Sequence, residues 1–142
     1  MSFDLKIANG DLVIGSDGDI VQVSDSDKLV QDILKVLITP IGTNKFFPTY
    51  GSPISKTLIG NTYDFSFIGS VATNQINSSL NLLKQLQQIQ INSGQKVTPK
   101  ELISAIQDVN VERNQVDPRF FRVYVRVIDR SFTTQVAAFD VG

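Results

Sequence analysis

The chain has 142 residues, a net charge of −1 and charged side chains at 19% of its positions, and it contains neither cysteine nor histidine. Without cysteine there are no disulfides or thiolate metal sites, and without histidine the usual zinc ligand and proton-transfer group near neutral pH are missing. The balanced charge argues against non-specific attraction to nucleic acid or to an anionic membrane.

The length is that of one ordinary domain, and we expect residues 1–142 to form a single one. The sequence does not open with a basic stretch followed by an apolar run, as a secretory signal would. No apolar run approaches the length of about 20 residues that crosses a bilayer. We therefore expect a soluble protein that is made in the cytosol.

The first 23 residues are typical of a small β-meander. Apolar and polar residues alternate along residues 3–7, and apolar runs follow at 12–14 and 20–23. Asn9-Gly10 between the first two runs is a hairpin turn signal, and Asp17-Gly18 marks a second turn. The carboxylates around Gly18 could suggest calcium, but no closing glutamate follows at the spacing of an EF-hand loop. We interpret the segment as a turn.

The next segment predicts a helix that begins at Ser24 or Ser26 and ends near Thr39. Apolar residues recur along it at three- and four-residue steps, and Pro40 disfavours helix in the residue before it. The segment 40–53 is rich in glycine, proline and aromatic residues, and we expect an ordered loop. The residues expected to hold this loop in place are Phe46, Phe47 and Tyr50.

A short helical stretch from Ile54 to Gly60 leads to a long amphipathic helix, from about Tyr63 to Asn92. Apolar residues form one stripe along the long helix, and asparagine, glutamine and serine occupy the other face. A surface of this kind costs less to desolvate than a charged one, which favours a permanent assembly. General amino-acid usage explains the glutamines equally well.

Residues 98–101, Thr-Pro-Lys-Glu, match a capping box with proline in the first turn, and they predict a further helix. This helix would bury Leu102, Ile103 and Ile106. The chain would then turn through residues 110–120.

The last predicted element is a hairpin with strands at 121–128 and 132–141. The apolar face of the first strand carries Phe121, Val123, Val125 and Val127, and the other face carries Arg122, Tyr124, Arg126 and Ile128. The predicted fold class is therefore α+β, with an N-terminal β-meander, two to four helices including one long amphipathic helix, and a C-terminal antiparallel β-hairpin.

Familiar catalytic templates are missing. Ser–His and Cys–His pairs cannot form, and there is no Walker-type phosphate loop, G-x-G-x-x-G turn or G-x-S-x-G elbow. Glu112 and Asp117 could supply the carboxylate pair of a glycoside hydrolase, but Arg113 and Arg119 would favour their ionised forms, whereas a general acid needs a raised pKa. Structural ion pairs explain these residues better, and we expect no enzyme, no cofactor and no metal site.

Arginines cluster between 113 and 130 and outnumber the acids there. Arg122 and Arg126 project to the same side of their predicted strand, with Tyr124 between them. Three interpretations are open: a stripe that follows a phosphate backbone, a solvated sheet face, or an interface where arginine and tyrosine anchor a protein partner. We favour the protein interface.

The order of these segments resembles the phage baseplate wedge or sheath-initiator family, which includes a baseplate component of type VI secretion systems. In that family a helix leads into T-P-x-G, aromatic residues and Y-G-S. The matching residues here are Thr39, Pro40, Gly42, Phe46, Phe47, Tyr50, Gly51 and Ser52. A looser match is the acid-Pro-Arg tripeptide, here Asp117-Pro118-Arg119, with Glu112-Arg113 as an additional acid–arginine pair.

The resemblance implies a structural role in the tail baseplate of a virion, in several symmetry-related copies, with no nucleic-acid or membrane partner. Wedge proteins would be held by Glu112, Arg113, Asp117, Pro118 and Arg119, with Arg119 as the favoured arginine. The tail sheath protein would dock on the hairpin at Arg122, Tyr124 and Arg126 by strand addition to an exposed edge, and the tail tube is a further candidate partner. Some family members carry a lysozyme-like label, so a peptidoglycan-degrading tail enzyme is the alternative.

Overall fold

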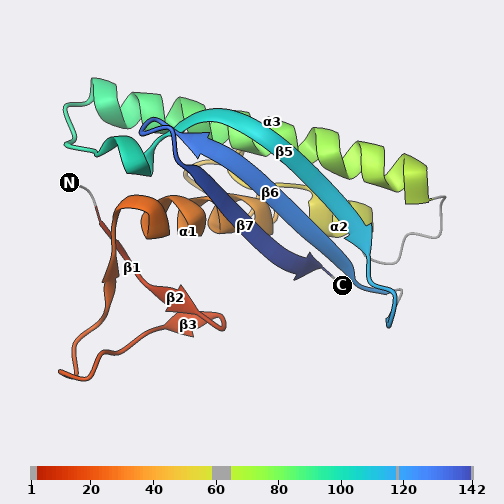
Figure 1. Ribbon diagram of the computed structural model, residues 1–142, viewed down its shortest axis with the longest axis horizontal. Coiled ribbons are helices and arrows are strands. Elements are labelled where there is room, and N and C mark those ends of the chain that lie inside the picture. Colours follow the sequence, from red (N-terminus) through yellow and green to blue (C-terminus); the bar gives the residue numbers. More distant parts are fainter. Residues whose placement is uncertain (1–2, 59–64, 118, 142) are drawn as a thin grey trace.

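The computed structural model describes residues 3–58, 65–117 and 119–141. Its elements form an α+β fold, which confirms the predicted class (Figure 1). Gly60 and Tyr63, where helix boundaries are predicted, lie outside the described residues. In chain order the elements are β1 (Asp4–Leu5), β2 (Ile7–Ala8), β3 (Asp11–Leu12), β4 (Gln22–Val23), α1 (Asp25–Ile38), α2 (Ile54–Leu58), α3 (Phe65–Asn92), the 3-10 turn η1 (Pro99–Glu101), β5 (Ile103–Arg113), β6 (Phe121–Asp129) and β7 (Thr134–Val141).

A three-stranded antiparallel sheet, in the order β5-β6-β7, packs one face against α1 and α3 (Figure 1). One apolar cluster joins this face to the helices. Its members include Ile33, Leu37, Ile76, Leu80 and Val125, each at most 1% exposed. Burying an aliphatic side chain of this size contributes about 1.5–3 kcal/mol, so the sheet–helix layer supplies most of the hydrophobic stabilisation.

Strand β6 alternates as the sequence predicts. Phe121, Val123, Val125 and Val127 are buried, while the side chains between them are exposed. The predicted hairpin is only part of the sheet, however, because β5 pairs with the other side of β6. β6 is therefore the central strand, paired along both sides, so the open edge of the predicted hairpin can only belong to β7.

The predicted helix after Thr98 is a single 3-10 turn. The Thr98 N–H donates to the Glu101 carboxylate (3.0 Å), as in a capping box, and the Thr98 hydroxyl donates to Asp25 on α1 (2.6 Å). The backbone that follows is bonded to Gln87 on α3. The Gln87 side chain donates to the Glu101 carbonyl (3.0 Å) and accepts from the Ile103 N–H (2.9 Å). These contacts end the turn and start β5, so the helix prediction is wrong.

The helix-like spacing in this segment comes from irregular pairing in β5. Its register against β6 shifts between Ile103 and Ala105 and again between Ile106 and Asp108. Each shift places an extra residue in β5, so Ile103, Ile106 and Val109 all face the helices although they are three residues apart. A three-residue spacing imitates the period of a helix.

α1 begins and ends where the sequence predicts. Ser24 is its N-cap, with extended backbone at φ −145° and ψ 173°, and Asp25 and Asp27 occupy the first turn, where the helix dipole favours acids. The Thr39 N–H and hydroxyl both donate to the Lys35 carbonyl, at 3.0 and 2.6 Å. This double contact satisfies a carbonyl that the helix end would leave without a partner.

α3 carries the predicted apolar stripe. Its buried members are Ile68, Ala72, Ile76, Leu80 and Leu83. The stripe lies in the core. Asn74, Asn81, Gln85 and Gln88 are exposed, whereas Ser79 and Gln87 are buried. None of the helices in the described part of the chain has both the length and the apolarity to span a bilayer.

The N-terminal meander forms three short arms that meet at one point. Three backbone hydrogen bonds make the junction: Lys6 N–H to the Val21 carbonyl (2.8 Å), Val13 N–H to the Lys6 carbonyl (3.1 Å) and Val21 N–H to the Val13 carbonyl (2.9 Å). The β1–β4 arm lies next to α1, the β2–β3 arm ends at Asn9-Gly10, and the third arm ends in the turn at Gly18 (Figure 1). Both residues of the Asn9-Gly10 turn have positive φ, as a type I′ hairpin requires.

Polar contacts fix the meander to α1. The Gln31 side chain accepts from the Ile7 N–H (3.0 Å) and donates to the Leu5 carbonyl (2.8 Å) and the Asp4 carboxylate (3.1 Å). Lys35 forms an ion pair with the same carboxylate. Burial opposes ionisation of Asp4, but hydrogen bonds from Lys35 and the Leu5 N–H outweigh it and lower the Asp4 pKa. Among the described residues of the meander only Val23 is buried, so side-chain hydrogen bonds are the main link.

Candidate functional site

The predicted acid-Pro-Arg site lies in the loop between β5 and β6. Because β5 runs to Arg113, the turn that was expected through 110–120 is confined to 114–120. The Asn114 N–H donates to the Phe120 carbonyl (2.9 Å), and the Asn114 side-chain oxygen accepts from the N–H groups of Val116 (2.8 Å) and Asp117 (3.2 Å). An asparagine that bonds the backbone ahead of it fixes a turn, so the loop presents its side chains in a defined way.

Asp117 and Arg119 form a two-bond ion pair at the tip of this loop. The Arg119 Nε lies 3.0 Å from Oδ1 of Asp117, and Nη2 lies 2.9 Å from Oδ2. The side-chain bond from Arg119 lowers the pKa of Asp117, and the same bond raises the pKa of Arg119. The Arg119 side chain is 83% exposed, so its remaining donors and its planar face are accessible to a partner. Pro118 lies outside the described residues.

Glu112 and Arg113 end β5 and project to opposite faces of the sheet. Glu112 lies opposite Arg122 and accepts a hydrogen bond from the Asn110 side chain (2.9 Å). Arg113 lies opposite Phe121, with its guanidinium carbon 5.2 Å from the ring centroid, a cation–π distance. The structure therefore does not bring these two residues together in one site.

Arg122, Tyr124 and Arg126 line the outer face of β6 between acids of the neighbouring strands. The register places Arg122 between Glu112 and Asp140, and Arg126 opposite Asp108. Arg122 Nη1 lies 3.5 Å from Asp140, and its guanidinium carbon lies 5.6 Å from the centroid of the Tyr124 ring. Carboxylates beside both arginines reduce the positive charge of this face and would repel a phosphate backbone.

A shallow hollow of about 250 Å³ lies on this outer face. Its lining residues are Asp108, Asn110, Glu112, Tyr124, Val125, Arg126 and Val136. They come from all three strands, and they combine charged groups with apolar ones. Sequence reasoning found the β6 members but missed Asp108, Asn110 and Val136, because their position depends on strand register.

The open backbone edges of the sheet belong to β5 and β7. β5 is interrupted by two register shifts, whereas β7 pairs with β6 without any, and bulges protect an edge from further pairing. The Asp129 N–H donates to the Thr133 carbonyl (3.0 Å). Hydrogen-bonded pairs alternate along an antiparallel ladder, so the N–H groups of Val136 and Ala138 point toward the open edge of β7.

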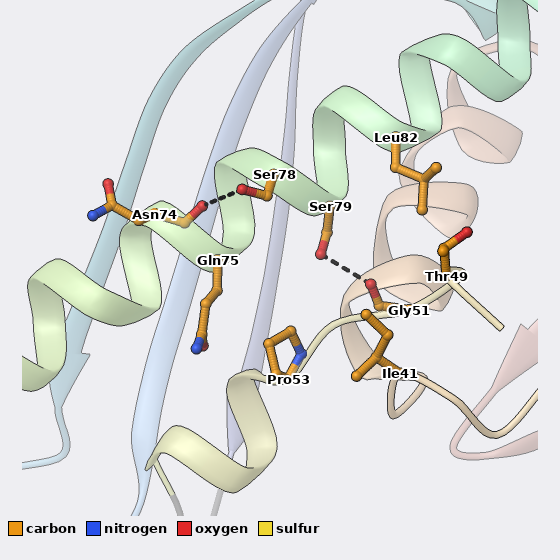
Figure 2. Close-up of a pocket in the computed structure, with 9 residues that line it drawn as sticks. All are labelled: Ile41, Thr49, Gly51, Pro53, Asn74, Gln75, Ser78, Ser79 and Leu82. Atoms are coloured by element: carbon orange, nitrogen blue, oxygen red, sulfur yellow. Dashed lines mark hydrogen bonds between the residues drawn. The ribbon is translucent and has the colours of Figure 1, made fainter.

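The T-P-x-G and Y-G-S residues close the base of the 39–52 loop. The Ser52 N–H donates to the Thr39 carbonyl (2.9 Å), next to a parallel bridge between Pro40 and Ser52. Gly51 has φ +115°, and a Cβ there would lie 2.5 Å from the Thr39 carbonyl oxygen, so only glycine fits. Ser79 on α3 donates to the Gly51 carbonyl (3.0 Å; Figure 2). The two loop ends are thus fixed to each other and to α3.

Of the three aromatic residues predicted to hold this loop, Tyr50 alone packs against the core. Burial raises the pKa of the Tyr50 hydroxyl, and Asp32 and Asp4 add to the shift. Phe46 and Phe47 are 94% and 51% exposed, at a tip where the Asn44 side chain accepts from both of their N–H groups (3.0 and 3.1 Å). The prediction is wrong for both phenylalanines, which are free to contact a partner.

A pocket of about 460 Å³ lies between this loop and α3 (Figure 2). Its lining residues are Ile41, Thr49, Gly51, Pro53, Asn74, Gln75, Ser78, Ser79 and Leu82. The polar groups among them are neutral hydroxyls and amides. No function was predicted for the α3 residues of this pocket, and the signal available was their place on the amide-rich face of a long helix.

The carboxylates considered for glycoside cleavage lie in the β5–β6 loop and on the outer sheet face. Arg119 lowers the pKa of Asp117, and a general acid needs the opposite shift. Glu112 lies on the outer sheet face, and neither residue lines the pocket beside α3. Within the described residues, no three acidic side chains gather as ligands for a metal ion.

No protein-family model matches this sequence, and no curated protein sequence matches it. A solved structure has the same fold: a protein of Geobacter sulfurreducens that is named a candidate tail lysozyme. The TM-score is 0.55, the sequence identity is 15%, and the likeness covers 82% of this chain and 90% of the other. The similarity is one of fold, and it extends over most of both chains.

Proposed function

We propose that this chain is a structural subunit of a contractile phage-tail baseplate, located in the virion tail, that binds wedge proteins around the tube and nucleates the sheath. The observation that carries the proposal is the uninterrupted open edge of β7, on a fold shared with a protein named for a tail. Strand addition uses such an edge: backbone hydrogen bonds supply affinity, and alternate side chains supply specificity.

The sheath contact on this proposal lies at β7, with Arg122, Tyr124 and Arg126 beside it. The outer side chains of β7 share the sheet face with these three residues, so an added strand would extend the same face. The C-terminal part of the resembled family is similar to the sheath protein, whose subunits exchange strands. The proposed partner is therefore an extended segment of the sheath.

The wedge contact on this proposal is made by Asp117 and Arg119. Their pair lies on an ordered loop and is exposed, and a guanidinium fork can bond a partner carboxylate while it keeps its own. We expect Arg119→Ala to prevent sheath assembly in a phage that carries this chain. Normal sheath on tails with Arg119→Ala would remove Arg119 from the proposal.

The strand-addition step is tested by Ala138→Pro. Proline removes an N–H that points to the open edge, and edge strands tolerate proline at such positions. The matched control is Ala138→Ser, which keeps the N–H. We expect tails with Ala138→Pro to lack sheath in electron micrographs and tails with Ala138→Ser to be normal, with both proteins folded by circular dichroism. Normal sheath on tails with Ala138→Pro would contradict strand addition at β7.

Immunogold labelling of intact particles tests the location. We expect several gold particles at the distal plate of each tail, because the chain is proposed to be present in several copies.

The second candidate function, peptidoglycan hydrolysis, is favoured by the name of the Geobacter protein alone. We propose that the chain has no such activity. Clearing of purified cell walls that is lost in Glu112→Gln would favour the enzyme instead.

A further inference from the structure

The N-terminal meander exposes an apolar face. Its large apolar side chains are 37–67% exposed: Phe3, Leu5, Ile7, Leu12, Ile14 and Ile20. Soluble monomeric proteins rarely leave a contiguous apolar patch of this kind uncovered unless it binds something. The sheet–helix core does not use this face, and neither does the proposed sheath contact at β7.

Strand pairing explains why these side chains share one face. Ile7 lies opposite Leu12, and Ile14 lies opposite Ile20, and residues directly opposite in an antiparallel pair point to the same side. Residues two apart along a strand also share a side, which adds the remaining members. The reverse side faces the body of the protein, where Val23 is buried and Asp4 contacts α1.

Carboxylates lie at one of the three arms, beside the Ile14–Ile20 pair. Asp17 and Asp19 form the turn of this arm. Both are exposed, and neither forms an ion pair within the described part of the chain. Their oxygens accept backbone N–H groups of neighbouring residues instead. The margin is therefore negative and ordered.

We propose that this face binds an amphipathic helix of another protein, whose apolar stripe is flanked by lysine or arginine. A sheet face is normally covered by a helix or a second sheet, and a helix would complete a layer on the meander opposite α1. The negative charge at the margin of the face favours a partner that carries positive charge. A second copy of this chain would bring Asp17 and Asp19 against like charges, and an anionic membrane would meet the same repulsion.

The test uses two synthetic peptides of about 18 residues, with leucines at the i, i+3, i+4 and i+7 spacing of an amphipathic helix. One carries lysine at all other positions, and the other carries glutamate. Fluorescence anisotropy measures binding of each peptide to the full chain. We expect the lysine peptide to bind at least about tenfold more tightly at low salt, and the difference to shrink in about 1 M salt.

Two variant pairs separate the apolar and charged contributions. Ile14→Ser with Ile20→Ser should weaken binding of the lysine peptide by about tenfold or more. Asp17→Asn with Asp19→Asn keeps the side-chain oxygens that accept hydrogen bonds in the turn. This pair should reduce the difference in binding affinity between the lysine and glutamate peptides. The matched control is Phe132→Ser, since Phe132 is 88% exposed but lies between β6 and β7, and this change should leave binding unaltered.

Equal binding of the two peptides, or unchanged binding after the Ile14 and Ile20 substitutions in a chain that keeps its circular dichroism spectrum, would overturn the proposal. Self-association in sedimentation experiments that the Ile14 and Ile20 substitutions abolish would assign the face to a second copy. Binding to vesicles with about 30% anionic lipid that the same substitutions abolish would assign it to a membrane. Either result would replace the helix as the occupant.

Discussion

The C-terminal sheet and the N-terminal meander are both antiparallel and both alternate apolar with polar residues, yet they use the alternation in opposite ways. β6 turns its apolar residues onto α1 and α3 and leaves Arg122 and Arg126 outside. The meander attaches to α1 by its other side and leaves Ile7 and Ile14 outside. Alternation therefore shows that a strand has an apolar face, but only the neighbouring elements decide whether that face becomes core or surface.

The largest expected effect is on the free energy of unfolding, when an isoleucine is replaced by alanine in each of the two regions. Ile103 in β5 is 2% exposed and Ile14 in the meander is 67% exposed. Ile103→Ala should lower the free energy of unfolding by about 2–5 kcal/mol, because it removes buried methyl groups and leaves a cavity. Ile14→Ala should change it by less than about 0.5 kcal/mol. Urea denaturation followed by circular dichroism measures both, and equal losses would contradict the contrast between the regions.

The next effect concerns aspartates at turns of the two regions. Asp129 is buried, which by itself raises its pKa, but hydrogen bonds from Ser131, Thr133 and Gln135 outweigh burial and lower the pKa below the usual 3.8. A lowered pKa stabilises the fold above the unfolded value, and this contribution is lost as pH falls through the folded value. Asp129→Asn should therefore cost about 1.5–3 kcal/mol at pH 7.

That cost should shrink as the pH falls below about 4, where protonation removes the charge from the native residue as well. Thermal unfolding between pH 7 and pH 2.5 measures it. The matched control is Asp17→Asn at the exposed meander turn, where the carboxylate accepts the Asp19 N–H alone. We expect Asp17→Asn to change the free energy of unfolding by no more than about 0.5 kcal/mol. A pH-independent cost for Asp129→Asn would show that geometry, and not charge, holds the β6–β7 turn.

A smaller and more local effect is expected where the two regions join. Gln31→Ala removes the side chain that bonds Asp4, Leu5 and Ile7, and each such bond is worth about 1 kcal/mol. Hydrogen exchange at the Lys6, Val13 and Val21 amides should become faster, while the amides of β6 keep their protection. The control is Gln88→Ala, which removes an exposed glutamine of α3. Faster exchange in β6 as well would show that the meander and the sheet unfold together.

The smallest effect is expected on the outer sheet face. Arg122 and Asp140 lie 3.5 Å apart and are about half exposed, and exposed pairs of this kind contribute about 0.2–1 kcal/mol. A double-mutant cycle with Arg122→Gln and Asp140→Asn should give a coupling of this size at low salt and almost none in about 1 M salt. A coupling that salt does not reduce would mean that this face is less accessible to solvent than the structure shows.

Local signals predicted most of the elements. The bounds of α1, the apolar stripe of α3, the Asn9-Gly10 turn and the alternation of β6 depend on residues close together in sequence, and all are found. β5 was misassigned because two extra residues in the strand give Ile103, Ile106 and Val109 a helical spacing. Nothing in a single sequence distinguishes that spacing from a real helix, since bulges arise from pairing with a distant strand.

The candidate site was predictable only in part. The Asp117–Arg119 pair is local, and the sequence identified it. The acids beside Arg122 and Arg126 could not be assigned, because Asp140 lies eighteen residues from Arg122 in sequence and meets it only through strand register. The exposure of Phe46 was missed for a similar reason: aromatic residues in a loop indicate order, but not which of them faces the core.

The 39–52 loop is joined to the rest of the molecule at its base, through Thr39, Gly51 and Ser52, whereas Asn44, Lys45 and Phe46 at its tip are outside the core. Loop-closure entropy rises slowly with length, and exposed tips tolerate insertions best. A peptide tag or fluorophore-binding sequence inserted between Asn44 and Lys45 should therefore leave the fold intact. The position offers an internal handle for labelling the protein inside a large assembly, where both chain ends could be covered by neighbours.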